Sequence, residues 1–388
     1  MAFADHDHTY ATATSKETAI TDTNPLSGLE ALAKQVRETG ITQIRDVLID
    51  DRLFPSARGT GSGPDQLTPI IVNDNVIDVI VTPASTVGRP ANIRLRPATG
   101  LVQMDSRVET AAKGESPQIE VISTGKQRFL VRGKLAVDSP PMVRVWNVDE
   151  PATFARAWFI EALRREGIAV GASLLQPQGE LPPRDGYEKL PRVASFASPP
   201  LSEAIKVTLK VSHNLYASTL PLLVAARNGQ TTVAAGLRAQ RRFLVDLGVP
   251  VETISFAGGA GGAQADCATP RATVKLLQAM RLRKEYPAWH AGFPILGVDG
   301  TLAEAVGPES PAKGKVHAKT GTLSWFDAMN GRTFLRSKAL AGTLVTASGK
   351  EMVIAMFVND VPLPAGVTPL REGRTLGRLS EIIHLHGP

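Results

Sequence analysis

Helix-forming and strand-forming patterns occupy separate stretches of this 388-residue chain, and this separation limits its fold more than any other feature. Between residues 66 and 150, short alternating runs predict a β-rich region, with strands at 91–95, 119–123, 127–135 and 142–148. Apolar residues at helical spacing then predict helical stretches at 200–228, 232–247 and 271–283. Strands return at 315–320, 339–346 and 351–359, before a final helix at 373–385. Grouping of helices apart from strands is typical of an α+β fold rather than a doubly wound sheet.

Turn and cap residues mark the ends of several other elements. Residues 27–40 predict a helix, and a strand is expected at 44–49. The run IIVNDNVIDVIV predicts two strands joined by a tight turn at Asn73-Asp74-Asn75. Pro151 suits the first turn of a helix, where its missing N–H costs nothing. Ser348-Gly349-Lys350 predicts the turn of a hairpin between the last two strands.

Charge and cysteine content exclude several classes of protein. The chain has 43 Lys and Arg residues against 37 Asp and Glu, a formal net charge of +6 spread along its length. This excess is too dilute for nucleic-acid binding, and it is compatible with an anionic polymer as a partner. The single cysteine, Cys267, excludes an internal disulfide and a site made of clustered cysteines. We expect Cys267 to be a buried or half-buried structural thiol, and we expect no cofactor.

The first 25 residues are polar and show no clear period. Asp5, His6, Asp7 and His8 have side chains that bind metals, although we interpret this segment as an exposed polar arm. The N-terminal sequence as written has neither the basic nor the apolar region of a signal peptide. No run of about 18 apolar residues exists, so no transmembrane segment is predicted.

Two short motifs carry the polar side chains from which we predict a function. Ser212-His213-Asn214 lies at a junction between helical stretches, and Lys319-Thr320-Gly321-Thr322 follows on a predicted strand. In this order and setting they match the second and third motifs of serine penicillin-recognising enzymes, with His213 where that second motif has Asp.

The chemistry of acyl transfer explains the residue types of the Lys-Thr-Gly-Thr motif. A peptide that ends in a free carboxylate needs a cation at that end, which Lys319 supplies with the hydroxyls of Thr320 and Thr322. Gly321 lets an extended substrate approach the strand, and the Thr322 N–H is placed to stabilise an oxyanion.

Ser212 and Asn214 complete the predicted site. A serine here relays a proton to the leaving amine, and an asparagine holds a substrate amide and orients a catalytic lysine. Each motif alone also has a structural interpretation, with Ser212 and Asn214 as helix caps and the Lys-Thr-Gly-Thr motif as a strand end.

From about residue 26 onward the chain resembles the D-alanyl-D-alanine carboxypeptidase/endopeptidase family, the class C low-molecular-mass penicillin-binding proteins. The resembling stretches include KVSHNLYASTL, HAKTGTL and KALAGTLVTASGKEMVIAMFVND. The resemblance implies a penicillin-binding-protein/β-lactamase-like transpeptidase domain of antiparallel sheet and helical cluster. It implies that residues 26–190 are an inserted region, with a β-rich part at about 66–150, and that residues 191–388 are the C-terminal part of the catalytic domain.

The resemblance also implies an activity. Family members are serine-type peptidases that cleave the D-Ala-D-Ala ends of peptidoglycan stem peptides through an acyl-enzyme, bind β-lactams and act in the periplasm or otherwise outside the cytoplasm. No nucleic-acid partner is implied. The implied catalytic residues are Ser212, Asn214 and Lys319, and the implied substrate-binding residues are Lys319, Thr320, Gly321 and Thr322.

The chain departs from the family at the first motif, Ser-x-x-Lys, which is expected on a helix upstream of the insert. Ser123-Thr-Gly-Lys126 lies in a strand pattern and Ser310-Pro-Ala-Lys313 contains a proline, so neither forms the helix that brings the lysine to the serine. We therefore predict that neither Ser123 nor Ser310 belongs to the site. We further predict that the N-terminal part of the catalytic domain is missing and that the chain is inactive.

Two alternatives remain open. In the first, the chain is a non-catalytic peptidoglycan-binding homologue. In the second, it is an esterase or β-lactamase of the same superfamily. The glycine-rich loop at 258–262 lacks a nucleotide-binding context, and we interpret it as a rim of the active site.

Overall fold

The structure is a computed structural model, and it describes residues 23–388. Asp5, His6, Asp7 and His8, the alternative metal ligands, therefore lie outside the described residues. The described chain forms two compact units, one from residues 23–58 and 62–199 and the other from residues 59–61 and 200–388. Of the helices in residues 23–388, none has the length and apolarity that crossing a bilayer requires.

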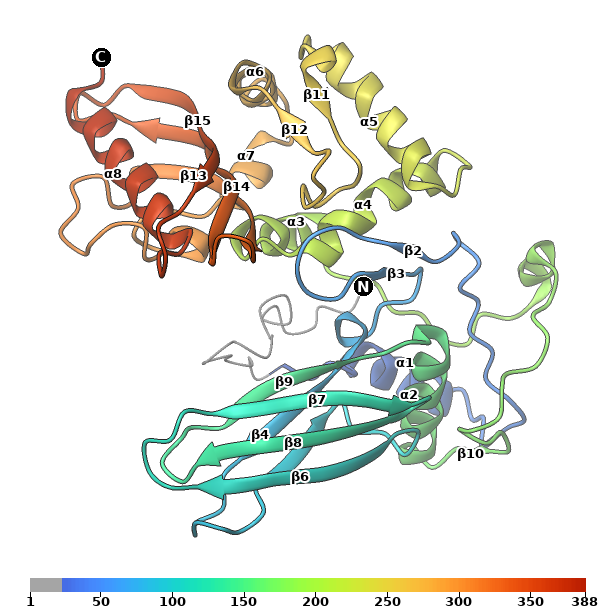
Figure 1. The fold of residues 1–388 in the computed structure, drawn as a ribbon. Helices are drawn as coiled ribbons and strands as arrows, with labels where there is room; N and C mark the ends of the chain where they lie inside the picture. Colours follow the sequence, from blue (N-terminus) through green and yellow to red (C-terminus); the bar gives the residue numbers. More distant parts are fainter. Residues whose placement is uncertain (1–22) are drawn as a thin grey trace. The chain divides into compact units, whose positions relative to one another are not determined.

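The first unit contains two three-stranded sheets (Figure 1). In one sheet β4 is central and antiparallel to β5 and β9, and in the other β8 is central, parallel to β6 and antiparallel to β7. The strands are β4 (Val76–Thr82), β5 (Asn92–Arg96), β6 (Gln103–Ala111), β7 (Gln118–Gly125), β8 (Arg128–Ala136) and β9 (Met142–Asn147). The strands predicted at 91–95, 119–123, 127–135 and 142–148 are confirmed as β5, β7, β8 and β9.

A row of aromatic side chains joins these sheets to helix α2 (Pro151–Arg165). Phe129 stacks on Trp146 at 5.0 Å between ring centroids, Trp146 contacts Phe154 at 5.7 Å, and Phe154 contacts Trp158 at 5.6 Å. All belong to one buried core. Pro151 is the first residue of α2, as predicted.

The remaining elements of the first unit are short. Helix α1 (Ser27–Glu38) packs against α2, as the helical pattern at 27–40 predicts. Two-residue strands pair as β1 (Gln43–Ile44) with β10 (Ala169–Val170) and as β2 (Ala57–Arg58) with β3 (Gln66–Leu67). Short 3-10 helices span Asn73–Asn75 and Arg184–Lys189.

The strand predicted at 44–49 is wrong beyond Ile44, because side chains replace strand pairing there. The Arg156 side chain is 3% exposed, and its guanidinium donates to the Val47 carbonyl at 2.8 Å and to the Asp46 carboxylate at 2.6 Å. Gln178 bonds both the N–H and the carbonyl of Ile49. These distant side chains satisfy backbone groups that a strand would otherwise have paired.

The turn predicted at residues 73–75 is present, but only one of its two strands forms. Asn73, Asp74 and Asn75 all adopt left-handed backbone angles, with φ of 49°, 53° and 57°. Their side chains are buried, and the Asn73 amide bonds the Val76 carbonyl at 2.9 Å. This left-handed run leads into β4, while residues 68–72 form no strand. Strand β6 was not predicted, because its sequence QMDSRVETA has few apolar residues.

The second unit is organised around one antiparallel sheet of order β13-β14-β15. Its strands are β13 (Val316–Asp327), β14 (Arg332–Val345) and β15 (Glu351–Pro362). The turn at Ser348-Gly349-Lys350 is confirmed, with Gly349 at φ +85°. Strands β13 and β14 run beyond the predicted 315–320 and 339–346, because Asn330-Gly331 closes a longer hairpin.

Six helices accompany this sheet: α3 (Leu201–Lys210), α4 (Asn214–Arg227), α5 (Val233–Asp246), α6 (Pro270–Met280), α7 (Tyr286–Ala291) and α8 (Leu370–His386). Short strands β11 (Ile254–Ser255) and β12 (Cys267–Ala268) pair between α5 and α6, and 3-10 turns span Val251–Thr253 and Gly300–Leu302. The predicted helices at 232–247, 271–283 and 373–385 are confirmed as α5, α6 and α8, and the stretch at 200–228 divides into α3 and α4.

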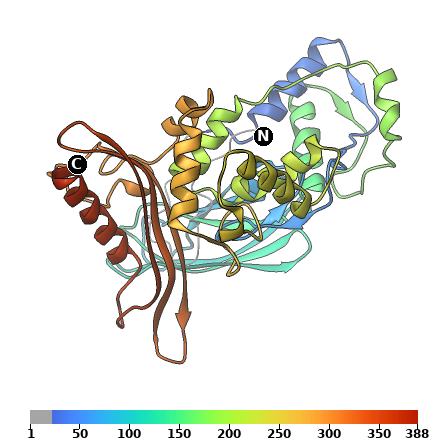
Figure 2. The same cartoon turned by 90° about the horizontal axis from the view of Figure 1, so that it is seen from above.

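Helices lie on both faces of the sheet (Figure 2). On one face, Leu376 of α8 packs with Leu340, Leu344 and Ile354. On the other, His290 of α7 lies 2.8 Å from the Thr343 hydroxyl. Successive residues of a strand point to opposite faces, so Leu340 and Leu344 of β14 face α8 whereas Thr343 faces α7. A β13 residue faces the same side as the β14 residue with which it pairs.

Candidate active site

The Ser212-His213-Asn214 motif lies at the break between α3 and α4. Ser212 adopts a left-handed conformation with φ +61°, which is uncommon for a residue other than glycine. His213 is fully buried, and its Nδ1 caps α4 by accepting from the Tyr216 N–H at 3.4 Å. Asn214 is the first residue of α4. A buried cap on one side and a strained turn on the other therefore hold Ser212 and Asn214 in place.

The Lys319-Thr320-Gly321-Thr322 motif contacts the Ser212-His213-Asn214 motif through Lys319. The Lys319 Nζ donates to Ser212 Oγ at 2.7 Å and to the Thr320 carbonyl at 2.6 Å. Ser212 and Lys319 are 107 positions apart in the chain, so this contact is formed entirely by tertiary structure. The structure thus places a hydroxyl and an ammonium group side by side at the end of α3 and the middle of β13.

Hydroxyls line β13 beyond Lys319. The Thr320 Oγ1 donates to the Thr301 Oγ1 at 2.7 Å, and the Thr322 Oγ1 accepts from the Lys338 Nζ at 2.6 Å. A side chain at Gly321 would meet only the Ala339 Cβ, at an ordinary contact distance of 3.6 Å. The fold itself therefore does not require a glycine at 321.

Strand β13 is an edge strand, and its outer edge is open at the motif. The segment at 294–296 bonds the start of the strand, with the Ala318 N–H donating to the Pro294 carbonyl at 3.0 Å. Beyond Ala318, no strand in residues 23–388 pairs with this outer edge. An extended peptide that aligns here gains backbone hydrogen bonds beside Lys319, Thr320 and Thr322.

The electrostatics of the site favour an anion. Burial and the nearby positive charge of Lys338 lower the pKa of Lys319 to about 8. Burial also lowers the pKa of Lys338. Within residues 23–388, neither ammonium group forms an ion pair with a carboxylate. A bound carboxylate would interact favourably with both ammonium groups.

The glycine-rich loop packs closely against these elements. A side chain at Gly259 would lie 2.0 Å from the Ala217 carbonyl oxygen of α4, and one at Gly262 would lie 2.3 Å from the Gly61 nitrogen. Gly61 in turn contacts Asn214, since a side chain there would lie 2.7 Å from the Asn214 amide group. These glycines allow backbone segments to approach one another, and the loop needs no bound phosphate to explain it.

A hollow of about 320 Å³ separates this loop from the sheet. Gly261 and Asp266 line it on the loop side, and Gly321 and Thr322 line it on the strand side. The Asp266 carboxylate accepts from the Ala257 and Ala263 N–H groups and so closes the loop. Cys267 also lines this hollow and is exposed, so the expectation of a buried or half-buried thiol is wrong. It belongs to the two-residue strand β12, which pairs only with β11 in a two-stranded sheet.

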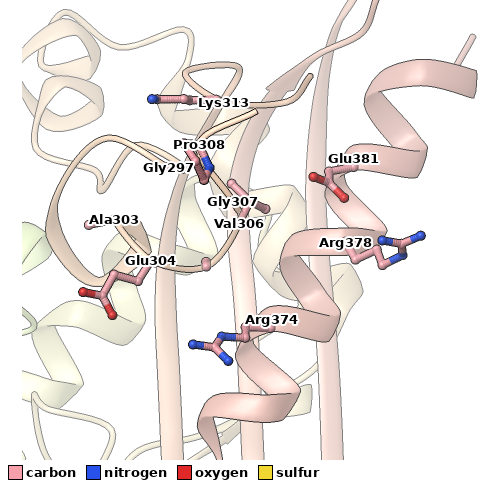
Figure 3. A pocket seen from close by; sticks show the side chains of 11 residues that line it. Gly297, Ala303, Glu304, Val306, Gly307, Pro308, Lys313, Arg374, Arg378 and Glu381 are labelled. Carbon is pink, nitrogen blue, oxygen red and sulfur yellow. The ribbon is translucent and has the colours of Figure 1, made fainter. Parts of the chain in front are cut away.

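Neither serine of the two Ser-x-x-Lys matches contacts Lys319. Ser123 lies on β7 in the first unit, where its Oγ accepts from the Trp146 Nε1 at 2.9 Å. The Ser310 Oγ accepts from the Ala312 N–H at 3.3 Å. Its partner Lys313 lines a separate hollow of about 700 Å³ between the 297–313 loop and α8 (Figure 3). That hollow contains no residue of either motif.

Sequence reasoning missed Lys338. Asn330-Gly331 is a turn signal that indicates a β13–β14 hairpin. Counting back from it alone would place Ser337 opposite Thr322, but an irregularity in the pairing at Leu323/Ser324 shifts the register by one residue. Lys338 therefore stands opposite Thr322 for a reason that the sequence pattern does not show. In residues 23–388, no three His, Cys, Asp or Glu side chains are grouped as metal ligands.

Comparison with known proteins decides the family. Residues 7–370 match the D-Ala-D-Ala carboxypeptidase 3 (S13) family. The chain belongs to this family. The resemblance drawn from the Ser212-His213-Asn214 and Lys319-Thr320-Gly321-Thr322 motifs is thereby confirmed.

Curated relatives carry the same description. The chain is 30% identical over 326 residues to a D-alanyl-D-alanine carboxypeptidase of Actinomadura sp. (strain R39), covering 78% of this chain and 60% of that protein. It is 26% identical over 346 residues to D-alanyl-D-alanine carboxypeptidase DacB of Haemophilus influenzae, covering 85% and 68%. This S13 chain thus spans 60% of the length of the Actinomadura relative.

Solved structures confirm the fold class. The crystal structure of penicillin binding protein 4 (dacB) from Haemophilus influenzae matches with a TM-score of 0.65 at 23% identity, covering 90% of this chain and 78% of that one. A second structure of the same protein, complexed with a β-lactam, also gives 0.65, at 22% identity and coverages of 92% and 78%. The S13 chain therefore has the expected penicillin-binding-protein fold.

Proposed function

We propose that this S13 chain binds the D-Ala-D-Ala end of peptidoglycan stem peptides, in the manner of a serine-type D-Ala-D-Ala carboxypeptidase or endopeptidase. The observation that carries the proposal is the 2.7 Å hydrogen bond from Lys319 Nζ to Ser212 Oγ beside the open edge of β13. An ammonium group without a carboxylate partner in residues 23–388 is the group that a terminal carboxylate needs. Peptidoglycan as the substrate places the protein in the periplasm or elsewhere outside the cytoplasm.

Each residue then has a role that follows from its position. Lys319 attracts the terminal carboxylate, and the Thr322 hydroxyl donates to it. The Thr320 hydroxyl donates to Thr301 here, and it must exchange that bond for one to the ligand. The peptide extends along β13, where Gly321 presents no side chain. In acyl transfer, the Thr322 N–H stabilises the oxyanion and Ser212 relays a proton to the leaving amine. Asn214 holds a substrate amide.

A β-lactam carries a carboxylate beside a strained amide, and it therefore fits the same groups. We propose β-lactams as ligands of this site. The structure of penicillin binding protein 4 from Haemophilus influenzae in complex with a β-lactam supports this proposal, because that protein has the same fold as this chain.

A second candidate function is binding without acylation. It is favoured by the positions of Ser123 and Ser310, since neither serine hydroxyl contacts Lys319. Acylation by this chain requires a serine activated by a neighbouring base, and the two Ser-x-x-Lys matches do not supply one. Incubation with a fluorescent β-lactam, denaturation and peptide mass spectrometry separates the two functions: a label retained on one serine shows acylation, and reversible competition alone shows binding.

We expect the chain to bind a synthetic tripeptide ending in D-Ala-D-Ala about 10–100-fold more tightly as the free acid than as the C-terminal amide. A charge-assisted hydrogen bond contributes about 1.5–3 kcal/mol, which gives this ratio. Fluorescence titration of both peptides at one ionic strength measures it, with a β-lactam as competitor. Equal affinity for the acid and the amide would contradict the proposed function.

The same site should lose affinity for the acid as the pH rises through about 8. Lys319 has a pKa of about 8, so it is charged below this pH and becomes neutral above it. In the unfolded chain its pKa returns to the usual 10.5, so the folded protein binds fewer protons between pH 8 and 10.5. Unfolding free energy should therefore rise over the interval in which peptide affinity falls. Titrations and thermal melts from pH 7 to 10 test both, and a Lys319→Met variant should remove both slopes.

A further inference from the structure

We propose that Lys338 is a positioning residue of the carboxylate site, which orients the Thr322 hydroxyl toward the ligand and makes the site select ligands with a free terminal carboxylate. This inference rests on the proposed function and extends it by a residue outside both motifs. It follows from the register of the β13–β14 hairpin and from the surroundings of the Lys338 side chain.

Register brings the two side chains to one face. Thr322 pairs directly with Lys338 across the two strands, and directly opposed residues project on the same face of a sheet. The Lys338 Nζ lies 2.6 Å from the Thr322 Oγ1. An ammonium group only donates, so the Thr322 oxygen must accept this bond.

Accepting that bond determines what the Thr322 hydroxyl does next. Its own hydrogen is directed away from Lys338, and Thr322 is an exposed residue beside the open outer edge of β13. The hydroxyl is therefore a donor for a ligand that lies along this edge. Because its oxygen is bonded to a cation, the hydroxyl is polarised and becomes a stronger donor to an anion.

The Lys338 side chain has little freedom to turn elsewhere. It is half-buried and passes under the first turn of α8, where a side chain at Gly373 would lie 3.1 Å from its Cε. A hollow of about 260 Å³ adjoins it, lined mainly by aliphatic residues such as Leu340 and Leu370. The Lys338 ammonium group donates to the Thr322 Oγ1, whereas no hydrogen bond or ion pair joins it to Thr301, Glu304 or Thr320, the polar residues that line the hollow with it.

Charge gives Lys338 a second effect on the same ligand. Lys319 and Lys338 lie on neighbouring strands, and the positive charge of Lys338 opposes protonation of Lys319. Neither lysine forms an ion pair within residues 23–388. A carboxylate bound at the edge of β13 interacts favourably with both cations, whereas a carboxamide does not. Selection of the acid over the amide is the property that distinguishes this role from that of a structural hydrogen bond.

The test compares the D-Ala-D-Ala tripeptide as free acid and as amide in five variants of the full chain. Lys338→Met should lower the acid-to-amide affinity ratio about 5–10-fold, because it weakens binding of the charged acid more than binding of the neutral amide. Lys338→Arg keeps the charge and a donor, so it should retain most of the ratio. Lys350→Met, at an exposed turn of the same sheet, should leave the ratio unchanged. In a Thr322→Val chain, adding Lys338→Met should lower the acid-to-amide affinity ratio much less than Lys338→Met lowers it in the wild-type chain. The reason is that the lysine acts largely through the Thr322 hydroxyl.

The outcomes separate this inference from the proposed function. A wild-type chain that prefers the acid, together with a folded Lys338→Met variant that keeps the full ratio, overturns the role of Lys338 alone. A wild-type chain that binds acid and amide equally overturns the proposed function, and this inference with it. Thermal melts of each variant confirm folding, and Lys338→Gln replaces the methionine variant if that one does not fold.

Discussion

Replacing Lys319 with methionine should remove most of the preference for a peptide acid over its amide while the chain stays folded. The affinity for the peptide acid is expected to fall about 100-fold, because the variant removes the cation that contacts the ligand directly. The Ser212 hydroxyl loses its ammonium donor as well, so a β-lactam should compete correspondingly less well.

Folding should not suffer from this change. Lys319 has a pKa of about 8 and is therefore held charged against its surroundings at pH 7. Methionine is of similar length and uncharged, so unfolding free energy should stay the same or rise by about 1–3 kcal/mol. Titration with both peptides and thermal melts at pH 7 measure the two effects, with Lys350→Met as the matched control. Retention of the wild-type acid preference in a folded Lys319→Met chain would remove Lys319 from the site.

Substitution by alanine should have different effects at two glycines on neighbouring strands, lowering stability at one and peptide binding at the other. At Gly342 of β14 a side chain would lie 2.1 Å from the His317 carbonyl oxygen and 2.6 Å from the Ala318 Cα. These are backbone atoms of β13, and they can move only if the sheet opens. We expect Gly342→Ala to lower the unfolding free energy by about 3 kcal/mol, the upper end of the usual range for an overpacked interior.

At Gly321 of β13 the same substitution has room. The added carbon would meet only the Ala339 Cβ at 3.6 Å, and Gly321 has no left-handed backbone angle that alanine would strain. Gly321→Ala should therefore keep wild-type stability within about 1 kcal/mol. It should still weaken peptide binding about tenfold, because the methyl group projects into the hollow beside the β13 edge.

Thermal melts and peptide titration of both alanine variants distinguish a structural glycine from a functional one. Loss of stability in Gly321→Ala without loss of binding would show that Gly321 serves the fold. If Gly342→Ala melts near the wild-type temperature, strands β13 and β14 can accommodate a methyl group that the contact distances exclude.

Much of the helical structure could be predicted because helices depend on nearby residues. Pro151 at the first turn of α2 and the apolar spacing of α5 and α8 are local signals, and each of these elements lies where it was expected. Strands were less predictable, since their partners are distant in sequence. Strand β6 has few apolar residues and exists because β8 pairs with it, and the expected strand at 44–49 is replaced by bonds from Arg156 and Gln178.

For the site, the sequence by itself determined the residue types and their order. Ser212, Asn214 and the Lys319-Thr320-Gly321-Thr322 run are local patterns whose chemistry can be read without a fold, and they indicated the S13 family that the comparisons confirmed. Only the tertiary structure decided that Ser212 and Lys319 touch, because that contact joins a helix junction to a strand more than a hundred positions away.

Tertiary structure alone also decided which residue of β14 pairs with Thr322. The pairing irregularity at Leu323/Ser324 moves β14 by one position, and in a sheet one position exchanges the two faces. Lys338 rather than Ser337 therefore faces Thr322, and α8 keeps the lysine there. Register is set by the sum of many weak contacts along two strands, so no short stretch of sequence contains it.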